Sequence, residues 1–293
     1  MKILVLSSGG DAPGMNKFVF ELYKKFKSQL YFAYAGFNGL VNNQIYPVSE
    51  VIKDKNVQHQ AGTVIKSSRC PEFCEQEVFE KGFETAKGFD CVIILGGNGS
   101  EKGAKRLYES GVNTIFVPGT IDNDVDDCCY TIGFSTAVKE CVYAVESTMP
   151  SIRSFGHACL FEVMGREHEA IAHATADIVG ADYVVTNKKT LDFEILKNTI
   201  LKKYIQNESA CIIVRENIMA VEKIAKKLND MIGQDMVKFQ VVGRTQRGGK
   251  PTTIELKMAT RFATEVARCI KDKVFGVRVL ANEQLGIIVK EFK

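Results

Sequence analysis

The chain has 293 residues, of which 45% are hydrophobic and 25% are charged, and its formal net charge is +3. This length predicts two lobes or one large α/β unit, and the composition excludes disordered and fibrous proteins. The small charge, without a basic tract carrying interleaved aromatic residues, excludes a nucleic-acid partner, and no apolar run reaches the length of a signal peptide or membrane span, so we expect a soluble cytoplasmic protein that does not contact a membrane.

Short β-branched runs alternate with helical patterns along almost the whole chain. A buried strand is predicted over residues 2–7, followed by a glycine-rich turn and a helix over 15–26. Further strands are predicted over 30–35, 91–95, 114–117, 159–163, 183–186, 211–214 and 239–242, and further helices over 101–110, 138–148, 191–204 and 220–232. This alternation predicts an α/β fold of two lobes, in which parallel sheets are covered by helices and ligands bind beyond the carboxyl ends of the strands.

Two glycine-rich loops each follow a predicted strand and precede a predicted helix. The first is SGGDAPGMN from Ser8, and the second is LGGNGS from Leu95, with Gly103 in the helix behind it. Glycine lets the backbone approach a phosphate, and a helix N-terminus offers N–H donors and partial positive charge. The first loop lacks the ending of a Walker A loop, and the second is one residue longer than a dinucleotide fingerprint. Each alone also fits an ordinary turn, but the two together favour phosphate binding.

The third motif is PGTIDND from Pro118, directly after another predicted strand. Its carboxylates Asp122 and Asp124 alternate in an extended segment, so they can point along one side. One could accept the proton of an attacking hydroxyl while the other helps to hold a metal ion, and phosphoryl transfer needs both tasks. The alternative is a solvated acidic turn, such as the neighbouring Asp126-Asp127.

Two arginine-bearing motifs follow later strands. These are EVMGR from Glu162 and GRTQRGG from Gly243. Arginines flanked by glycines suit bidentate recognition of a phosphate, although surface arginines in loops are common. Arg69, in the string SSR, is a further candidate for contacting a nucleotide phosphate.

Cysteine and histidine spacing argues against a zinc site. The nine cysteines are an odd number without disulfide-like spacing, so most are expected to be buried, reduced thiols. His168 and His173 lie five residues apart rather than the four of a metalloprotease motif, and we expect both to be structural.

Together these motifs resemble the ATP-dependent phosphofructokinases of bacterial type. The matching strings are GGDAPGMN from Gly9, PGTIDND from Pro118, EVMGR from Glu162, QRGG from Gln246 and NEQL from Asn282. They occur in the family's order over nearly the whole chain. The resemblance implies two Rossmann-like lobes: a nucleotide-binding lobe from residues 1–136 plus about 245–280, and a sugar-phosphate-binding lobe from 137–244 plus the C-terminal segment.

The resemblance further implies phosphoryl transfer from ATP to the 1-hydroxyl of fructose 6-phosphate in glycolysis. Asp122 would accept the hydroxyl proton, Thr120 would hold the transferring phosphate, and Arg166 would stabilise its charge. Mg²⁺ is expected at Asn98 and Asp124. ATP is expected at Gly10, Arg69, Cys70, Gly97, Asn98, Gly99, Ser100 and Gly103. The sugar phosphate is expected at Thr120, Asp122, His157, Met164, Gly165, Arg166, Glu216, Lys238, Arg244 and Arg247. A homotetramer is expected as well, because His157 and Lys238 fall where the family supplies arginines from a neighbouring subunit.

Several positions decide how far the resemblance extends. Gly99 and Gly119 are similar to the ATP-using branch, since pyrophosphate-using relatives carry aspartate and lysine there. Asn98 stands where the family holds magnesium with an aspartate, so it either contacts the metal or only caps a helix starting near Glu101. Arg244 stands where a histidine is usual. Two alternatives therefore remain beside the kinase: a non-catalytic paralogue that binds nucleotide or sugar phosphate, and a kinase of another hexose phosphate. The presence of Asp122 favours an enzyme.

Overall fold

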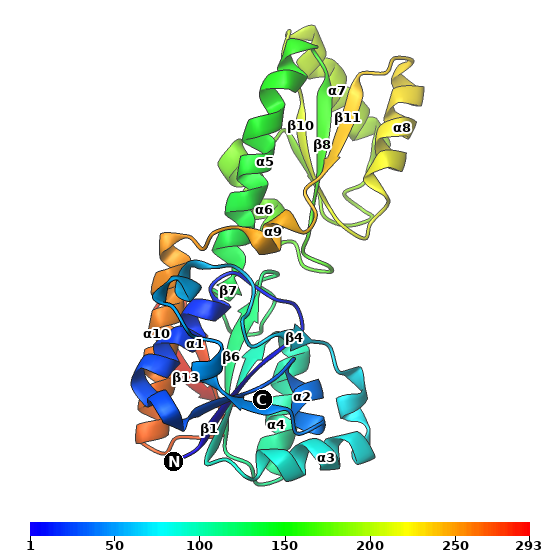
Figure 1. Ribbon diagram of the computed structural model, residues 1–293. Helices are drawn as coiled ribbons and strands as arrows, with labels where there is room; N and C mark the ends of the chain where they lie inside the picture. The colour runs from blue at the N-terminus through cyan, green and yellow to red at the C-terminus, as the bar shows by residue number, and fades with distance from the viewer. The chain divides into compact units, whose positions relative to one another are not determined.

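The computed structural model describes all 293 residues and separates them into two compact units (Figure 1). Unit 1 contains Met1–Thr136 and Arg247–Lys293, and unit 2 contains Ala137–Gln246. The chain therefore leaves unit 1 once and returns to it. The expectation that the segment after about residue 280 joins the second lobe is wrong, because it lies in unit 1 and its strand β13 extends the sheet of that unit.

The sheet of unit 1 has nine strands in the order β13-β12-β6-β5-β1-β2-β3, with β4 paired to β1 and β7 paired to β6. Its pairs are parallel except β2–β3 and β12–β13 at the two edges. The central strands β1 and β5 are buried at every residue, as expected of parallel strands covered on both faces. The strand bounds are β1 Ile3–Ser8, β2 Leu30–Ala33, β3 Ile45–Pro47, β4 Ser67–Ser68, β5 Cys91–Gly96, β6 Thr114–Thr120, β7 Ile132–Gly133, β12 Val277–Ala281 and β13 Ile287–Glu291.

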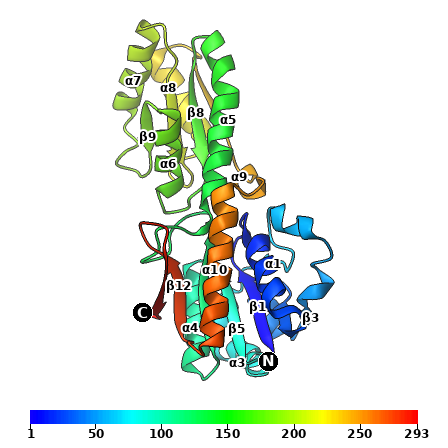
Figure 2. The same ribbon diagram turned by 90° about the vertical axis from the view of Figure 1, so that its left-hand side faces the viewer.

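Helices cover both faces of this sheet. Figures 1 and 2 show α1 and α10 on one face, and α3 and α4 on the other. The helix bounds are α1 Met15–Phe26, α2 Phe37–Val41, α3 Gln76–Ala86, α4 Asn98–Glu109 and α10 Thr253–Lys271, with short 3-10 helices η1 Lys27–Gln29, η2 Val48–Glu50, η3 Lys55–His59 and η4 Pro71–Cys74. Helix α5, Phe134–Ser154, begins in unit 1 and continues into unit 2.

Unit 2 is built on a parallel sheet in the order β11-β8-β10-β9. One face buries Leu160, Ile212 and Val214 against apolar residues of α7 and α8, among them Leu196 and Ile224. The strands are β8 Ala158–Val163, β9 Tyr183–Val185, β10 Cys211–Arg215 and β11 Val237–Val241, and the helices are α6 Ala170–Val179, α7 Phe193–Ile205, α8 Val221–Ile232 and α9 Thr245–Gly248.

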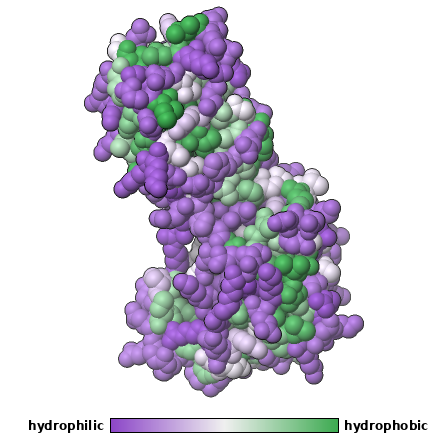
Figure 3. Space-filling view, turned by 180° about the vertical axis from the view of Figure 1, so that it is seen from behind, coloured by the Kyte–Doolittle hydropathy of each residue, from purple (hydrophilic) through white to green (hydrophobic).

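The predicted α/β class with parallel sheets is confirmed, while several element bounds differ. The strand predicted over 114–117 continues to Thr120, and the helix predicted over 138–148 runs from Phe134 to Ser154 with Pro150 inside it. Helices α3, α6 and α10 and strands β12 and β13 were not predicted, nor were the short elements α2, α9, β3, β4 and β7. No helix combines the length and the apolar character that crossing a membrane requires. Hydrophilic residues predominate on the side shown in Figure 3, with smaller hydrophobic areas between them.

Candidate active site

Three of the motifs found in the sequence meet at one edge of the sheet of unit 1. Strands β1, β5 and β6 are parallel neighbours, and their register places Ser8 opposite Gly96 and Gly96 opposite Pro118. The loops that follow these strands therefore begin side by side at the carboxyl edge. In a parallel α/β sheet this edge is where ligands bind.

The first glycine loop leads into α1 through left-handed backbone. Gly14 is the N-cap of α1 with φ 95°, and no side chain caps this helix end, which leaves its first N–H groups to an anion. A Cβ on Gly10 would lie 2.5 Å from Nη1 of Arg247, and this Nη1 donates a hydrogen bond of 2.7 Å to the carbonyl oxygen of Asp11. Arg247, expected at the sugar phosphate, thus lies against the first glycine loop.

The second glycine loop leads into α4, which begins at Asn98 with Gly97 as its N-cap. The hydroxyl of Ser100 is buried and donates to the carbonyl oxygen of Ser8 at 3.2 Å, which ties the two glycine loops together. A Cβ on Gly99 would meet open space. Gly103 is different, because its Cβ would lie 2.6 Å from the ring of Phe37. Close packing on Phe37 therefore explains Gly103, and its contact with a nucleotide stays a prediction.

Strand β4 brings Arg69 beside the first glycine loop. Gly9 donates its backbone N–H to the carbonyl oxygen of Ser68 at 3.0 Å, and the hydroxyl of Ser67 donates to the carbonyl oxygen of Gly9 at 2.9 Å. Cys70 follows as the N-cap of η4. Burial raises the pKa of the Cys70 thiol, so this cysteine remains a neutral thiol near neutral pH.

The acidic loop after β6 is held by hydrogen bonds within itself. Asp122 is 3% exposed, and its backbone N–H donates to Oγ1 of Thr120 at 3.2 Å. Asn123 has left-handed backbone with φ 51°, and its Oδ1 accepts the N–H of Thr131 at 2.9 Å. The hydroxyl of Thr131 in turn donates to the carbonyl oxygen of Thr120 at 2.6 Å. These contacts fix the backbone on either side of Asp122.

Asn98 contacts the same loop through its side chain. Its Nδ2 donates a hydrogen bond of 2.9 Å to the backbone carbonyl oxygen of Asp124. The alternative in which Asn98 caps a helix starting near Glu101 is wrong, because α4 already begins at Asn98. The bond engages only the amide nitrogen, so the amide oxygen remains for a metal ion. An amide oxygen and the carboxylate of the residue that Asn98 contacts form a donor set that fits Mg²⁺, which takes oxygen ligands and usually completes its shell with phosphates and water.

A buried arginine holds the far end of the acidic loop. Arg278 of β12 is 1% exposed, forms an ion pair with Asp127 at 3.0 Å and lies 3.4 Å from Glu101. Hydrogen bonds from Lys293 and from Arg278 lower the pKa of Asp127 to about 2. This contact was not predicted, and its only signal in the sequence is a charged residue inside the apolar run VRVLA.

A buried carboxylate supports both the acidic loop and the first glycine loop. Glu255 of α10 accepts the N–H of Gly133 at 2.7 Å and the N–H and hydroxyl of Thr136 at 3.2 and 3.1 Å. A Cβ on Gly14 would lie 2.8 Å from Cγ of Glu255. Burial raises the pKa of Glu255 to about 7, although the hydrogen bonds oppose this rise. The signal that could have revealed it is a capping box, since the hydroxyl of Thr252 accepts the N–H of Glu255 at 3.1 Å.

Unit 2 gathers several of the predicted sugar-phosphate residues at the carboxyl edge of its own sheet. Met164 donates its N–H to Oε1 of Gln246, and Arg166 donates its N–H to Oε1 of Glu216, each at 3.0 Å. Gly165 has φ 134°, and a Cβ there would lie 2.5 Å from the carbonyl oxygen of His168. Only glycine therefore fits between the two contacts. Arg244 is exposed in the loop after β11.

His157 and Lys238 lie at the opposite edge of this sheet. His157 directly precedes β8, and Lys238 pairs in register with Cys159 near the start of that strand. Strand β8 has six residues, so it separates them from Gly165 by roughly 20 Å at about 3.3 Å per residue. Lys238 forms an ion pair with Asp235 at 2.9 Å. Within one chain, His157 and Lys238 therefore lie far from the predicted sugar-phosphate residues around Gly165.

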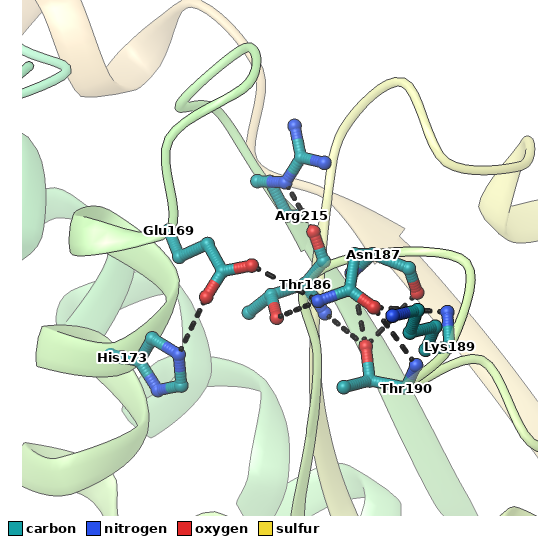
Figure 4. Close-up of polar contacts among 7 residues, drawn as sticks. All are labelled: Glu169, His173, Thr186, Asn187, Lys189, Thr190 and Arg215. Carbon is teal, nitrogen blue, oxygen red and sulfur yellow. Dashed lines mark hydrogen bonds and ion pairs between the residues drawn. The ribbon is translucent and has the colours of Figure 1, made fainter.

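A polar cluster that the sequence analysis did not identify lies at the carboxyl ends of β9 and β10 (Figure 4). Arg215, the last residue of β10, donates its Nε–H to the carbonyl oxygen of Thr186 at 2.6 Å. Asn187 donates to Oε1 of Glu169 at 3.1 Å, and Oε2 of Glu169 lies 3.4 Å from Nε2 of His173. The hydrogen bond from Asn187 is the largest cause that lowers the pKa of Glu169. Arg215 is 9% exposed, so this cluster contains a nearly buried guanidinium.

The family model and the relatives that match this chain are phosphofructokinases. A family model described as phosphofructokinase matches residues 2–270. The ATP-dependent 6-phosphofructokinase of Macrococcus caseolyticus is 33% identical over 294 residues, which cover 98% of this chain and 88% of that protein. The enzyme of the same name from Lactococcus lactis is 35% identical over 291 residues, which cover 97% and 85%.

Solved structures with the same fold include two phosphofructokinases. The Pichia pastoris phosphofructokinase in the T-state has a TM-score of 0.88 at 23% identity, and the match covers 99% of this chain and 35% of that chain. A pyrophosphate-dependent phosphofructokinase from Marinobacter aquaeolei has a TM-score of 0.86 at 16% identity, covering 100% and 83%. At these identities the likeness shows the fold alone.

Proposed function

Because this chain belongs to the phosphofructokinase family, we propose that it transfers the γ-phosphoryl group of ATP to the 1-hydroxyl of fructose 6-phosphate, a step of glycolysis. The products are fructose 1,6-bisphosphate and ADP. The observation that carries the proposal is the meeting of two glycine loops and the Asp122 loop at one sheet edge. That edge supplies phosphate-binding backbone and a general base together, which is what phosphoryl transfer requires.

Asp122 and Thr120 act at the acceptor oxygen and the transferring phosphoryl group. The carboxylate of Asp122 accepts the proton of the sugar 1-hydroxyl as the new oxygen–phosphorus bond forms and the bond to ADP breaks. Its low exposure favours this role, because a fixed charge in a water-poor site acts more strongly than one in water. The hydroxyl of Thr120 contacts the transferring phosphoryl group, and its bond to the Asp122 N–H couples the two residues.

The nucleotide binds along the two glycine loops. Their N–H groups at the starts of α1 and α4 meet the phosphates, and Arg69 lies beside the first loop. Bound Mg²⁺ would supply positive charge to the phosphate oxygens, and Asn98 and Asp124 are the residues that would hold it.

Glycine at positions 99 and 119 favours ATP over pyrophosphate as the phosphoryl donor. Gly119 also packs tightly, since a Cβ there would lie 2.7 Å from Cδ1 of Leu95. A lysine at 119, as in pyrophosphate-using relatives, would therefore clash with the core around Leu95. Close packing at Gly119 therefore opposes the lysine that pyrophosphate-using relatives carry at this position.

The sugar phosphate binds at the carboxyl edge of the sheet of unit 2. The residues that take part there are Met164, Gly165, Arg166, Glu216 and Arg244. Arg247, which lies against the first glycine loop of unit 1, stays a predicted sugar-phosphate contact. Arg166 neutralises charge on the transferring group.

We further propose a cytoplasmic homotetramer in which subunits share active sites. The position of His157 and Lys238 supports this, because they lie about one strand length from the other sugar-phosphate residues. In the proposed tetramer they would contribute to the site of a neighbouring subunit. Sedimentation analysis of the purified protein tests the tetramer, and a monomer at micromolar concentration would contradict it.

The decisive experiment is a coupled assay with ATP and magnesium against a panel of hexose phosphates. Turnover with fructose 6-phosphate as the best acceptor is expected. A different best acceptor would identify a kinase of another hexose phosphate. Binding of nucleotide and sugar phosphate without any turnover would identify a non-catalytic paralogue. Replacing ATP by pyrophosphate in the same assay tests the donor.

A further inference from the structure

Arg215 is a nearly buried cation without a counter-ion in the protein. Its side chain is 9% exposed, and the only hydrogen bond that it makes runs from Nε to the uncharged carbonyl oxygen of Thr186. No carboxylate pairs with it. A guanidinium carries five N–H donors and stays charged at any physiological pH, so most of its binding capacity is unused.

The neighbouring carboxylates are engaged elsewhere. Glu169 binds Asn187 and His173, and the groups that lower its pKa are Asn187, Thr186 and His173 rather than a guanidinium. Glu216 accepts the backbone N–H of Arg166. A buried charge that keeps no partner is strongly destabilising, so a position of this kind is expected to be occupied by a ligand anion in the working protein.

The location of Arg215 fits such a ligand. It ends β10, an inner strand of the parallel sheet of unit 2, at the edge where ligands bind. The next residue, Glu216, holds the backbone of Arg166, and a Cβ on Gly165 would lie 3.8 Å from Cγ of Arg215. In Figure 4 the terminal nitrogens of Arg215 point away from the cluster around Glu169 and Asn187. The side chain of Arg215 therefore starts beside Gly165, and its terminal nitrogens are turned away from the groups that already have partners.

We propose that Arg215 binds the phosphate group of the sugar-phosphate acceptor, an assignment that rests on the proposed function. A guanidinium and a phosphate form paired N–H···O bonds, and the bond from Nε to Thr186 fixes the plane in which Arg215 offers them. Binding of the substrate also neutralises the buried charge. Arg215 therefore contributes to affinity for the phosphorylated sugar and makes the empty protein less stable than it would be with an uncharged side chain.

The test replaces Arg215 by methionine and measures two quantities that should move in opposite directions. Without nucleotide, titration calorimetry with fructose 6-phosphate should show affinity weakened by roughly 30- to 100-fold, as expected for loss of a charged, paired contact. The ligand-free variant should unfold at an unchanged or higher temperature, because an unpaired charge has been removed. Arg153→Met, at an exposed arginine of the same unit, is the matched control and should change neither quantity.

Unchanged affinity with lowered stability would overturn the proposal and leave Arg215 as a structural donor to Thr186. If the methionine variant does not fold, Arg215→Lys decides instead. A point charge cannot reproduce the paired contact, so roughly tenfold weaker binding is expected, and unchanged affinity refutes the assignment.

Two further ligands identify what Arg215 recognises. Fructose, which lacks the phosphate, should bind wild type and Arg215→Met equally weakly, whereas inorganic phosphate should lose affinity in the variant. An affinity loss for phosphate without one for fructose 6-phosphate would assign Arg215 to another anion and refute the acceptor role. If the wild type neither binds nor phosphorylates fructose 6-phosphate, the proposed function fails. Arg215 is then judged with whichever hexose phosphate the wild type binds.

Discussion

Replacing Asn98 by aspartate changes one atom group in the proposed magnesium site and should produce two opposing effects. The first effect is tighter binding of Mg²⁺. A second carboxylate in a partly hydrated cleft should strengthen Mg²⁺ binding by about 1–3 kcal/mol, or ten- to a hundredfold. The second effect is lower folding stability, because aspartate cannot donate the 2.9 Å hydrogen bond that Nδ2 of Asn98 makes to the carbonyl oxygen of Asp124. The carbonyl oxygen of Asp124 then has no donor and faces a carboxylate oxygen, which should lower the free energy of unfolding by about 1–3 kcal/mol.

Each effect has its own assay. Initial rates measured at fixed ATP across a magnesium titration should show half-maximal activity at a lower magnesium concentration in Asn98→Asp than in wild type. Thermal unfolding without magnesium or nucleotide should show the variant to be less stable. Asn98→Ala is the matched control, because it loses the hydrogen bond without gaining a carboxylate. It should be destabilised without any reduced need for magnesium.

Superimposable magnesium titrations of Asn98→Asp and wild type would refute the metal-site assignment. Unchanged stability of both variants would refute the role of the bond to Asp124. Calorimetry of nucleotide binding with and without magnesium provides a readout that does not depend on turnover. If the added carboxylate strengthens Mg²⁺ binding, magnesium should increase the affinity for ATP more in Asn98→Asp than in wild type.

Four further substitutions test other parts of the site. Asp122→Asn should lower kcat by about 10²–10⁴ while leaving calorimetric affinity for fructose 6-phosphate nearly unchanged, and activity within a few-fold of wild type would remove Asp122 from the mechanism. Glu255 has a pKa raised from 4.5 to about 7, so its favourable contribution to stability is complete below pH 4.5 and is lost as pH rises through 7. Urea unfolding should therefore show wild type losing about 3 kcal/mol relative to Glu255→Gln between pH 4.5 and 8, and parallel pH profiles would contradict this. Gly119→Ala should lose about 1–3 kcal/mol in denaturant unfolding because its Cβ meets Leu95, whereas Gly99→Ala, with open space around the Cβ, should not; equal losses would argue against the packing explanation. His157→Arg should tighten apparent affinity for fructose 6-phosphate, because a guanidinium pairs with a phosphate through its planar fork, and an affinity like that of wild type would exclude His157 from the site.

The sequence predicted the position of the glycine and acidic loops well because a short-range pattern determines each of them. Buried parallel strands read as continuous apolar runs, and glycine-rich turns follow them directly, so the carboxyl edge could be located without knowing the strand order. The same reasoning gave the start of α1 at Met15. A motif of a few residues at one strand end can therefore be predicted without knowing which distant residues contact it.

The supporting residues could not be predicted, because their partners lie far away in the sequence. Glu255 binds Gly133 across 122 residues, and Arg278 binds Asp127 across 151 residues. Glu255 lies in the first turn of α10, where a glutamate is common, and Arg278 is the one charged residue in the apolar run VRVLA, so neither position identifies its distant partner. The run VRVLA, which forms β12, was not predicted as a strand. Arg215 likewise ends a buried strand, and only the fold shows that it has no counter-ion.

The division of unit 1 into two chain segments affects how a newly made chain can fold. Strand β6 acquires its partner β12 only after all 110 residues of unit 2 have been synthesised, since unit 1 resumes at Arg247. Until then the Asp122 loop has neither Arg278 nor Glu255 to hold it. Unit 2 is continuous, so it can complete its own sheet first. At about 5–20 residues per second, the first segment of unit 1 waits on the order of ten seconds for the remainder of its core, which is when a chaperone would find it exposed.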